Sequence, residues 1–201
     1  MLDKYFIKQL RNPLIKVASL AVRLGITANQ TTMFGFVVGM MSLPALVYER
    51  YDLALIFILI NRFMDGLDGA IARLKKPTDL GGYLDITLDF IFYSAVIFGF
   101  SLVDSVNNAV AASFLIFSFM GTGSSFLAFA IMAEKREIRS LDYGSKSLFY
   151  IGGLTEGAET IGFYIFVCLF PHHFATAAWL FGALCWVTTC TRLYAGYRTL
   201  K

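Results

Sequence analysis

The segment DGLDGAIARLKKPTDLGGYLDITLD, residues 65–89, places four aspartates inside two stretches that otherwise have the composition of membrane-spanning helices. Asp65 and Asp68 are three positions apart and Asp85 and Asp89 are four apart, so each pair lies on one face of a helix. A carboxylate inside a membrane is energetically costly and is retained where it binds something. If the two faces meet, their carboxylates form an oxygen-only ligand set, which suits Mg²⁺ or Mn²⁺.

Small residues occupy the same helical faces. Gly69 and Ala72 lie on the stripe of the first aspartate pair, Arg73 follows them, and Gly81 precedes the second pair by one turn. Such a bare surface lets a flat or phosphorylated ligand approach the backbone closely. The alternative is that the aspartates form structural ion pairs between helices, for which Arg62 and Arg73 are the cations nearby in the sequence.

The complete pattern, Asp65-x2-Asp68-Gly69-x2-Ala72-Arg73-x7-Gly81-x3-Asp85-x3-Asp89, resembles the signature of the CDP-alcohol phosphatidyltransferase family. The resemblance implies a membrane enzyme of phospholipid biosynthesis. Such an enzyme transfers a phosphatidyl group from a CDP-linked donor, here expected to be CDP-diacylglycerol, to an alcohol and releases CMP. The family also implies a homodimer.

The resemblance assigns roles to the residues of this pattern. Two divalent ions, Mg²⁺ or Mn²⁺, would neutralise the diphosphate, held by Asp65, Asp68 and Asp85. Asp89 would be the general base that accepts the proton of the attacking hydroxyl, and would also be able to contribute to one ion. The nucleotide would lie against Gly69, Ala72, Arg73 and Gly81.

The composition is that of an integral membrane protein, because 57% of the residues are hydrophobic and only 15% are charged. Residues 1–25 alternate basic and apolar side chains, which predicts an amphipathic helix on the membrane surface, broken or bent at Pro13. Residues 26–201 are predicted to form one all-α catalytic domain of six transmembrane helices. The expected spans are 30–48, 53–74, 79–102, 109–133, 148–170 and 174–197.

The lysines and arginines predict the orientation. Of 17 such residues, 15 fall on one side of the six spans, whereas the three opposite loops contain only Arg50. By the positive-inside rule, both termini and the acidic site face the cytoplasm, and the expected location is the bacterial inner membrane. The expected partners are therefore membrane lipids, and no stretch has the pattern of a nucleic-acid reader.

Asn29 belongs to the run Thr27–Thr32 before the first span. This run resembles the Thr-Pro-Asn sequence usual in the family, although Ala28 stands where proline is typical. Asn29 is predicted to cap the first transmembrane helix, and the alternative is that it lines the entrance of the nucleotide pocket.

The acceptor pocket is expected to use polar residues of the later spans: Glu156, Glu159, Ser124 and Arg136. One interpretation has the two glutamates bind acceptor hydroxyls or a cationic head group, and the other pairs one of them with Arg62. Arg136, with its basic neighbours Lys135, Arg139 and Arg192, either binds phosphate or only follows the positive-inside rule.

The sequence does not choose the alcohol. Two other functions stay open: an enzyme that uses a CDP-linked polar head group with a lipid alcohol as acceptor, and a divalent-cation transporter built on the same acidic residues.

Overall fold

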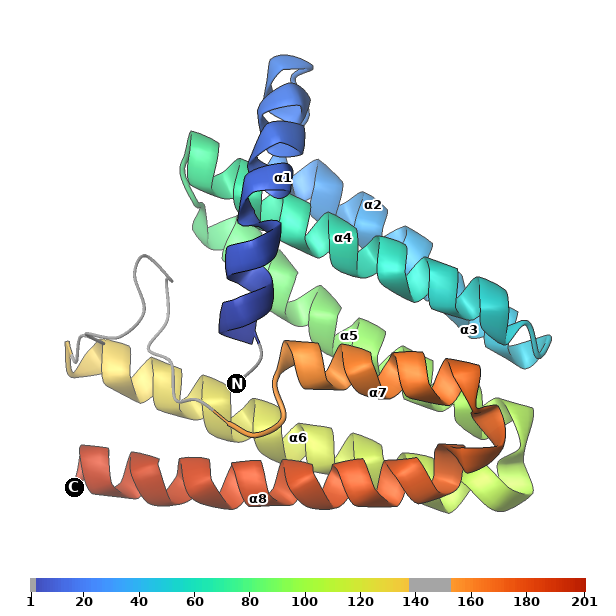
Figure 1. Cartoon of the computed structure of the whole chain (residues 1–201). Coiled ribbons are helices and arrows are strands. Elements are labelled where there is room, and N and C mark those ends of the chain that lie inside the picture. The colour runs from blue at the N-terminus through green and yellow to red at the C-terminus, as the bar shows by residue number, and fades with distance from the viewer. Residues whose placement is uncertain (1–2, 138–152) are drawn as a thin grey trace.

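The computed structural model describes residues 3–137 and 153–201, with side chains from residue 13 onward. The described chain is helical apart from short connections (Figure 1). Its elements are α1 (Asp3–Arg23), α2 (Ala28–Met40), α3 (Ser42–Val47), α4 (Tyr51–Lys75), α5 (Asp79–Val103), α6 (Ser105–Lys135), α7 (Gly157–Leu169), the 3₁₀ turn η1 (Pro171–His173) and α8 (Phe174–Leu200).

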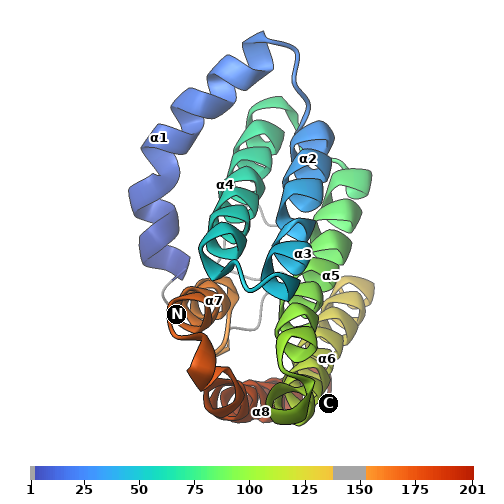
Figure 2. The same ribbon diagram turned by 90° about the vertical axis from the view of Figure 1, so that its right-hand side faces the viewer.

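The long helices form a bundle with one apolar core. The most extensive contacts join α6 to α8 and α2 to α4, and α5 lies between these two pairs (Figures 1 and 2). Stacked aromatic rings fill the centre, with ring centroids 4.6 Å apart for Phe100 and Phe174 and 4.9 Å apart for Phe163 and Phe181. Helix α2 packs against both α4 and α5, the two helices with the aspartates, and so holds them in a fixed relation to each other.

Within the described residues, four helical stretches are long and apolar enough to cross a membrane: 28–47, 79–103, 105–135 and 171–200. Helix α7 is apolar but shorter, and α4 is long but interrupted by charged residues. An all-α integral membrane protein is thus confirmed, whereas the number of six spans stays a prediction.

The first predicted span is two helices rather than one. Helix α2 ends at Met40 and α3 begins at Ser42, and Pro44 lies in the first turn of α3. Proline has no N–H to donate to the carbonyl four residues earlier, which here belongs to Met40, and its ring clashes with that carbonyl. The continuous helix therefore stops, and a new one starts where proline is tolerated.

The fifth predicted span starts later than expected. Residues 148–152 lie outside the described part of the chain, residues 153–156 are not helical, and α7 begins at Gly157. The reason is a capping box, in which the Glu156 side chain accepts from the backbone of the first turn and the Glu159 side chain accepts from the Glu156 N–H, 3.1 Å away. Glu156 therefore precedes the helix and does not share a helical face with Glu159.

Helix α1 lies across the bundle and packs against α4 (Figure 2). It is continuous from Asp3 to Arg23 with Pro13 inside it, so of the break or bend predicted at Pro13 the break is wrong. Its buried residues Ala18 and Ala21 form a second small apolar cluster with Leu67, Ala70 and Ile71 of α4. These α4 residues surround Asp68 in the sequence, so α1 supports the segment that carries the acidic pair.

Candidate active site

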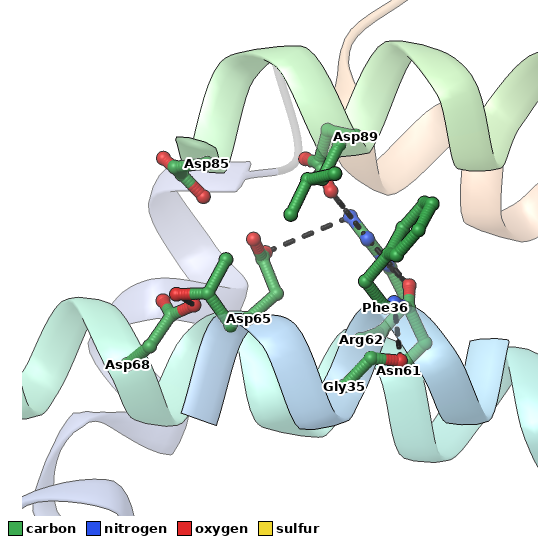
Figure 3. A pocket seen from close by; sticks show the side chains of 10 residues that line it. Gly35, Phe36, Asn61, Arg62, Asp65, Asp68, Asp85 and Asp89 are labelled. Atoms are coloured by element: carbon green, nitrogen blue, oxygen red, sulfur yellow. Dashed lines mark hydrogen bonds and ion pairs between the residues drawn. The ribbon is translucent and has the colours of Figure 1, made fainter. Parts of the chain in front are cut away.

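The α4–α5 hairpin brings the predicted aspartates together. One carboxylate oxygen from each of Asp65, Asp68 and Asp85 lies within 4.8 Å of the other two (Figure 3). Asp65 and Asp68 project from one side of α4, and Asp85 faces them from the first turns of α5. This three-carboxylate cluster is an oxygen-only donor set, so it could hold a divalent cation such as Mg²⁺ or Mn²⁺.

A threonine from a third helix holds one member of the cluster. The Thr32 hydroxyl of α2 lies 2.5 Å from Oδ2 of Asp68 and 3.0 Å from the carbonyl oxygen of Ala28. Its proton can therefore be donated to the carboxylate, and Asp68 itself is buried. Sequence reasoning missed this residue, because the hydrogen bond joins positions 36 apart.

Asp89, the fourth aspartate, pairs with Arg62 of α4. The two terminal nitrogens of Arg62 lie 2.5 Å from Oδ1 and 3.2 Å from Oδ2 of Asp89, so they donate to both carboxylate oxygens. Arg62 also lies 3.6 Å from Oδ2 of Asp65. The same pocket thus contains three clustered carboxylates and a fourth that is held by a guanidinium (Figure 3).

The ion pairs of the alternative interpretation are only partly present. Arg62 contacts Asp65 and Asp89, whereas the guanidinium of Arg73 lies over Gly69. A Cβ added at Gly69 would be 3.2 Å from a terminal nitrogen of Arg73. Arg73 therefore covers the small-residue face next to the cluster.

Asn29 lies over the second bare glycine. A Cβ added at Gly81 would be 3.2 Å from Oδ1 of Asn29 and 3.0 Å from the Thr78 hydroxyl. The predicted capping role of Asn29 is wrong, because the N-cap of α2 is Thr27, which forms a capping box with Gln30. Ala72, on the same turn of α4 as Gly69, is half-buried.

The residues predicted for the acceptor are not among those that line the pocket of the aspartates. Glu156 and Glu159 cap α7, and the Glu156 side chain also accepts from the Gly153 N–H at 2.9 Å. The Ser124 hydroxyl donates to the Gly121 carbonyl within α6. Arg136, at the end of α6, donates to the Leu200 carbonyl at the end of α8. These side chains help to hold the local backbone, and Arg139 lies outside the described residues.

The fold and the site define the class of protein: an all-α integral membrane protein with carboxylates from two consecutive helices in one polar pocket. The chain belongs to the CDP-alcohol phosphatidyltransferase family, an enzyme family whose sequence model matches residues 25–191. The predicted family and enzyme class are thus confirmed, which favours the enzyme over the transporter.

Two relatives extend over almost the whole chain. The inner membrane protein YnjF of Escherichia coli strain K12 is 50% identical over 201 residues, which are 100% of this chain and 98% of that protein. An archaetidylinositol phosphate synthase of Pyrococcus horikoshii is 29% identical over 194 residues, 96% of this chain and 95% of that one.

Solved structures of a mycobacterial enzyme have the same fold. The phosphatidylinositol phosphate synthase of Mycobacterium tuberculosis in complex with manganese and citrate superposes with a TM-score of 0.70 at 20% identity, covering 92% of this chain and 88% of that one. The same synthase with CDP-DAG bound gives a TM-score of 0.65 at 20% identity, covering 92% and 93%.

Proposed function

We propose that the protein transfers a phosphatidyl group from CDP-diacylglycerol to an alcohol and releases CMP. The observation that carries the proposal is the cluster of Asp65, Asp68 and Asp85, whose carboxylate oxygens lie within 4.8 Å of one another beside Asp89. The relatives support the choice of substrate, because the mycobacterial synthase of the same fold was solved with CDP-DAG bound.

The proposed metal site is the three-carboxylate cluster. Its donors fit Mg²⁺ or Mn²⁺, and the mycobacterial synthase was solved with manganese. When bound, one or two such ions would neutralise the negative charge of the diphosphate. Thr32 orients Asp68 by its hydrogen bond, so that the oxygens of the cluster stay directed at one point.

Asp89 is the proposed general base. It accepts the proton of the alcohol, the alcohol oxygen forms a bond to the lipid-side phosphorus, and the bond from that phosphorus to the oxygen of CMP breaks. Gly69, Ala72 and Gly81 give the nucleotide access to the backbone. Arg73 lies over Gly69 and Asn29 lies over Gly81. On binding, these side chains would either move aside or donate hydrogen bonds to the nucleotide, Arg73 to the diphosphate and Asn29 to the nucleobase.

The proposed orientation places the site on the cytoplasmic side of the inner membrane. The α4–α5 turn and the ends of α6 and α8 lie at the same end of the bundle (Figure 1) and carry most of the described basic residues, whereas the opposite end has Arg50. The relative from Escherichia coli is an inner membrane protein, which supports this location. We further propose that α1 is a surface helix attached to one catalytic domain, and that two such domains pair as a homodimer.

The test is CMP release by the purified protein in lipid nanodiscs. The protein receives CDP-diacylglycerol with Mn²⁺ or Mg²⁺ and a panel of alcohols, and lipid products are identified by mass. We expect metal-dependent CMP release that Asp89→Asn abolishes. Asp52→Asn is the matched control, because Asp52 lies on the same helix α4 as the cluster but at its other end, paired with Arg50 at 2.9 Å.

Two outcomes would contradict the proposal. Release of CMP from a CDP-linked head group, with a lipid alcohol as acceptor and none from CDP-diacylglycerol, would reverse the roles of the substrates. Metal uptake into liposomes without release of CMP would indicate a transporter.

A further inference from the structure

Arg62 is a cation among acids in the proposed active site. Of the ten residues that line the pocket, four are aspartates and Arg62 is the one with a positive charge. Its side chain is only 13% exposed. A guanidinium so enclosed among carboxylates has either a structural role, as charge compensation for the fold, or a role in the reaction.

The contacts of Arg62 fix its orientation as well as its charge. Besides the two bonds to Asp89, its terminal nitrogen donates to the Tyr93 hydroxyl at 2.7 Å, and its Nε donates to Oδ1 of Asn61 at 2.8 Å. The guanidinium carbon lies 5.0 Å from the ring centroids of both Phe92 and Tyr93. Charge compensation alone does not require so many directional contacts.

The partners of Arg62 are themselves held by neighbouring helices. The side-chain amide of Asn61 donates to the Gly35 carbonyl of α2 at 3.0 Å. The Tyr164 hydroxyl of α7 donates to the Tyr93 carbonyl of α5 at 2.8 Å. Four helices thus determine where the guanidinium lies, and through it where the Asp89 carboxylate lies.

We propose that Arg62 is a positioning residue that acts on the reaction through Asp89. The planar fork of the guanidinium binds both oxygens of this carboxylate and fixes its plane relative to the three-carboxylate cluster, while each oxygen keeps lone pairs for the alcohol. The inference rests on the proposed function, in which Asp89 receives the proton. In this proposal the three-carboxylate cluster binds the donor, and the Asp89 carboxylate, held by Arg62, meets the acceptor.

The variant that tests this inference is Arg62→Lys. Lysine keeps the positive charge but reaches the carboxylate as a single point and cannot bind both oxygens in one plane. Since a displacement of about 1 Å costs up to about 100-fold in rate, we expect kcat to fall roughly 10–100-fold. The KM for CDP-diacylglycerol and the Mn²⁺ concentration for half-maximal rate should change by less than about threefold, because lysine keeps a positive charge near Asp65 and the three carboxylates of the cluster are unchanged.

Two further variants complete the series. Tyr93→Phe removes one acceptor of the guanidinium and leaves the charge pair, so its kcat should fall less than that of Arg62→Lys, again with little change in KM. Arg62→Met leaves Asp89 without its cation and can fail to fold. The melting temperature and the size-exclusion profile identify such a failure, and the kcat and KM of Arg62→Lys then test the inference without the methionine variant.

The results that would overturn the inference are distinct from those that would overturn the proposed function. If the parent protein releases no CMP, the proposed function fails and the inference with it. If the parent is active and Arg62→Lys has the same kcat, charge alone is sufficient and only the inference fails. It fails also if KM or the Mn²⁺ requirement rises as much as kcat falls, because Arg62 would then support the whole pocket.

Discussion

Replacing Thr32 with valine removes a hydroxyl and keeps the shape of the side chain, so it tests how strongly the second layer of the site holds the metal ligands. The hydroxyl lies 2.5 Å from Oδ2 of the buried Asp68. A hydrogen bond to a charged group contributes about 1.5–3 kcal/mol. At about 1.4 kcal/mol per factor of ten, its loss corresponds to roughly 10–150-fold in an equilibrium constant. Losses of about 10–100-fold are usual when a partner of a metal ligand is removed.

The assay is CMP release from CDP-diacylglycerol as a function of Mn²⁺ concentration. We expect Thr32→Val to raise the Mn²⁺ concentration for half-maximal rate about 10–100-fold, with kcat at saturating Mn²⁺ close to that of the parent. The neighbouring Thr31→Val is the matched control, because the Thr31 hydroxyl donates to the Thr27 carbonyl within the helix at 3.1 Å. Equal Mn²⁺ dependence of the two variants would refute the reasoning that Thr32 orients Asp68.

Three other predictions concern the site, the packing and the connection between α5 and α6. Asp65→Asn should lower CMP release by at least about 100-fold, and a chelator should do the same to the parent. The melting temperature should not fall, because the substitution removes one of several crowded negative charges. Retained activity would contradict a role of Asp65 in the cluster. Gly39→Ala should destabilise the protein by about 1–3 kcal/mol, because its Cβ would be 2.8–2.9 Å from side-chain atoms of Asn61. The control Gly162→Ala should not destabilise it, because a Cβ there has nothing within 4 Å. Equal melting temperatures of the two variants would count against this close contact of α2 and α4. Hydrogen bonds from the first turn of α6 hold the pKa of Asp104 below its usual value, so its contribution to stability is present above the unfolded-state pKa and is lost as the pH falls through the lowered folded value. The melting-temperature difference between the parent and Asp104→Ala should therefore shrink on acidification. A pH-independent difference would exclude a charged cap.

Much of the fold and of the cluster could be predicted from local patterns. Long apolar stretches predicted the helices, and the spacing of the aspartates predicted which carboxylates share a face, because both depend on helical periodicity. The meeting of Asp85 with Asp65 and Asp68 followed from a short connection between two consecutive helices. These features need no knowledge of distant contacts.

The features that could not be predicted depend on contacts between distant segments. Thr32 reaches Asp68 across 36 positions, and Arg62 reaches Asp89 across 27. Whether Arg62 pairs with Asp89 or with a glutamate at the start of α7 depends on how the helices pack, and the sequence pattern does not contain that information. The capping of α2 is different, because Thr27-x2-Gln30 is a recognisable capping box, and that local signal could have corrected the role given to Asn29.

The four aspartates lie within 25 consecutive residues, on two helices joined only by residues 76–78. This proximity in sequence has a consequence for how the protein is made. Because nearby segments meet without closing a long loop, we expect the acidic residues to approach one another at little cost in chain entropy once α5 follows α4 into the membrane. Arg62 belongs to the same hairpin, so the cation arrives together with the acids that repel one another. The segment therefore brings its own positive charge into the membrane, whereas the final position of that charge is set together with α2 and α7.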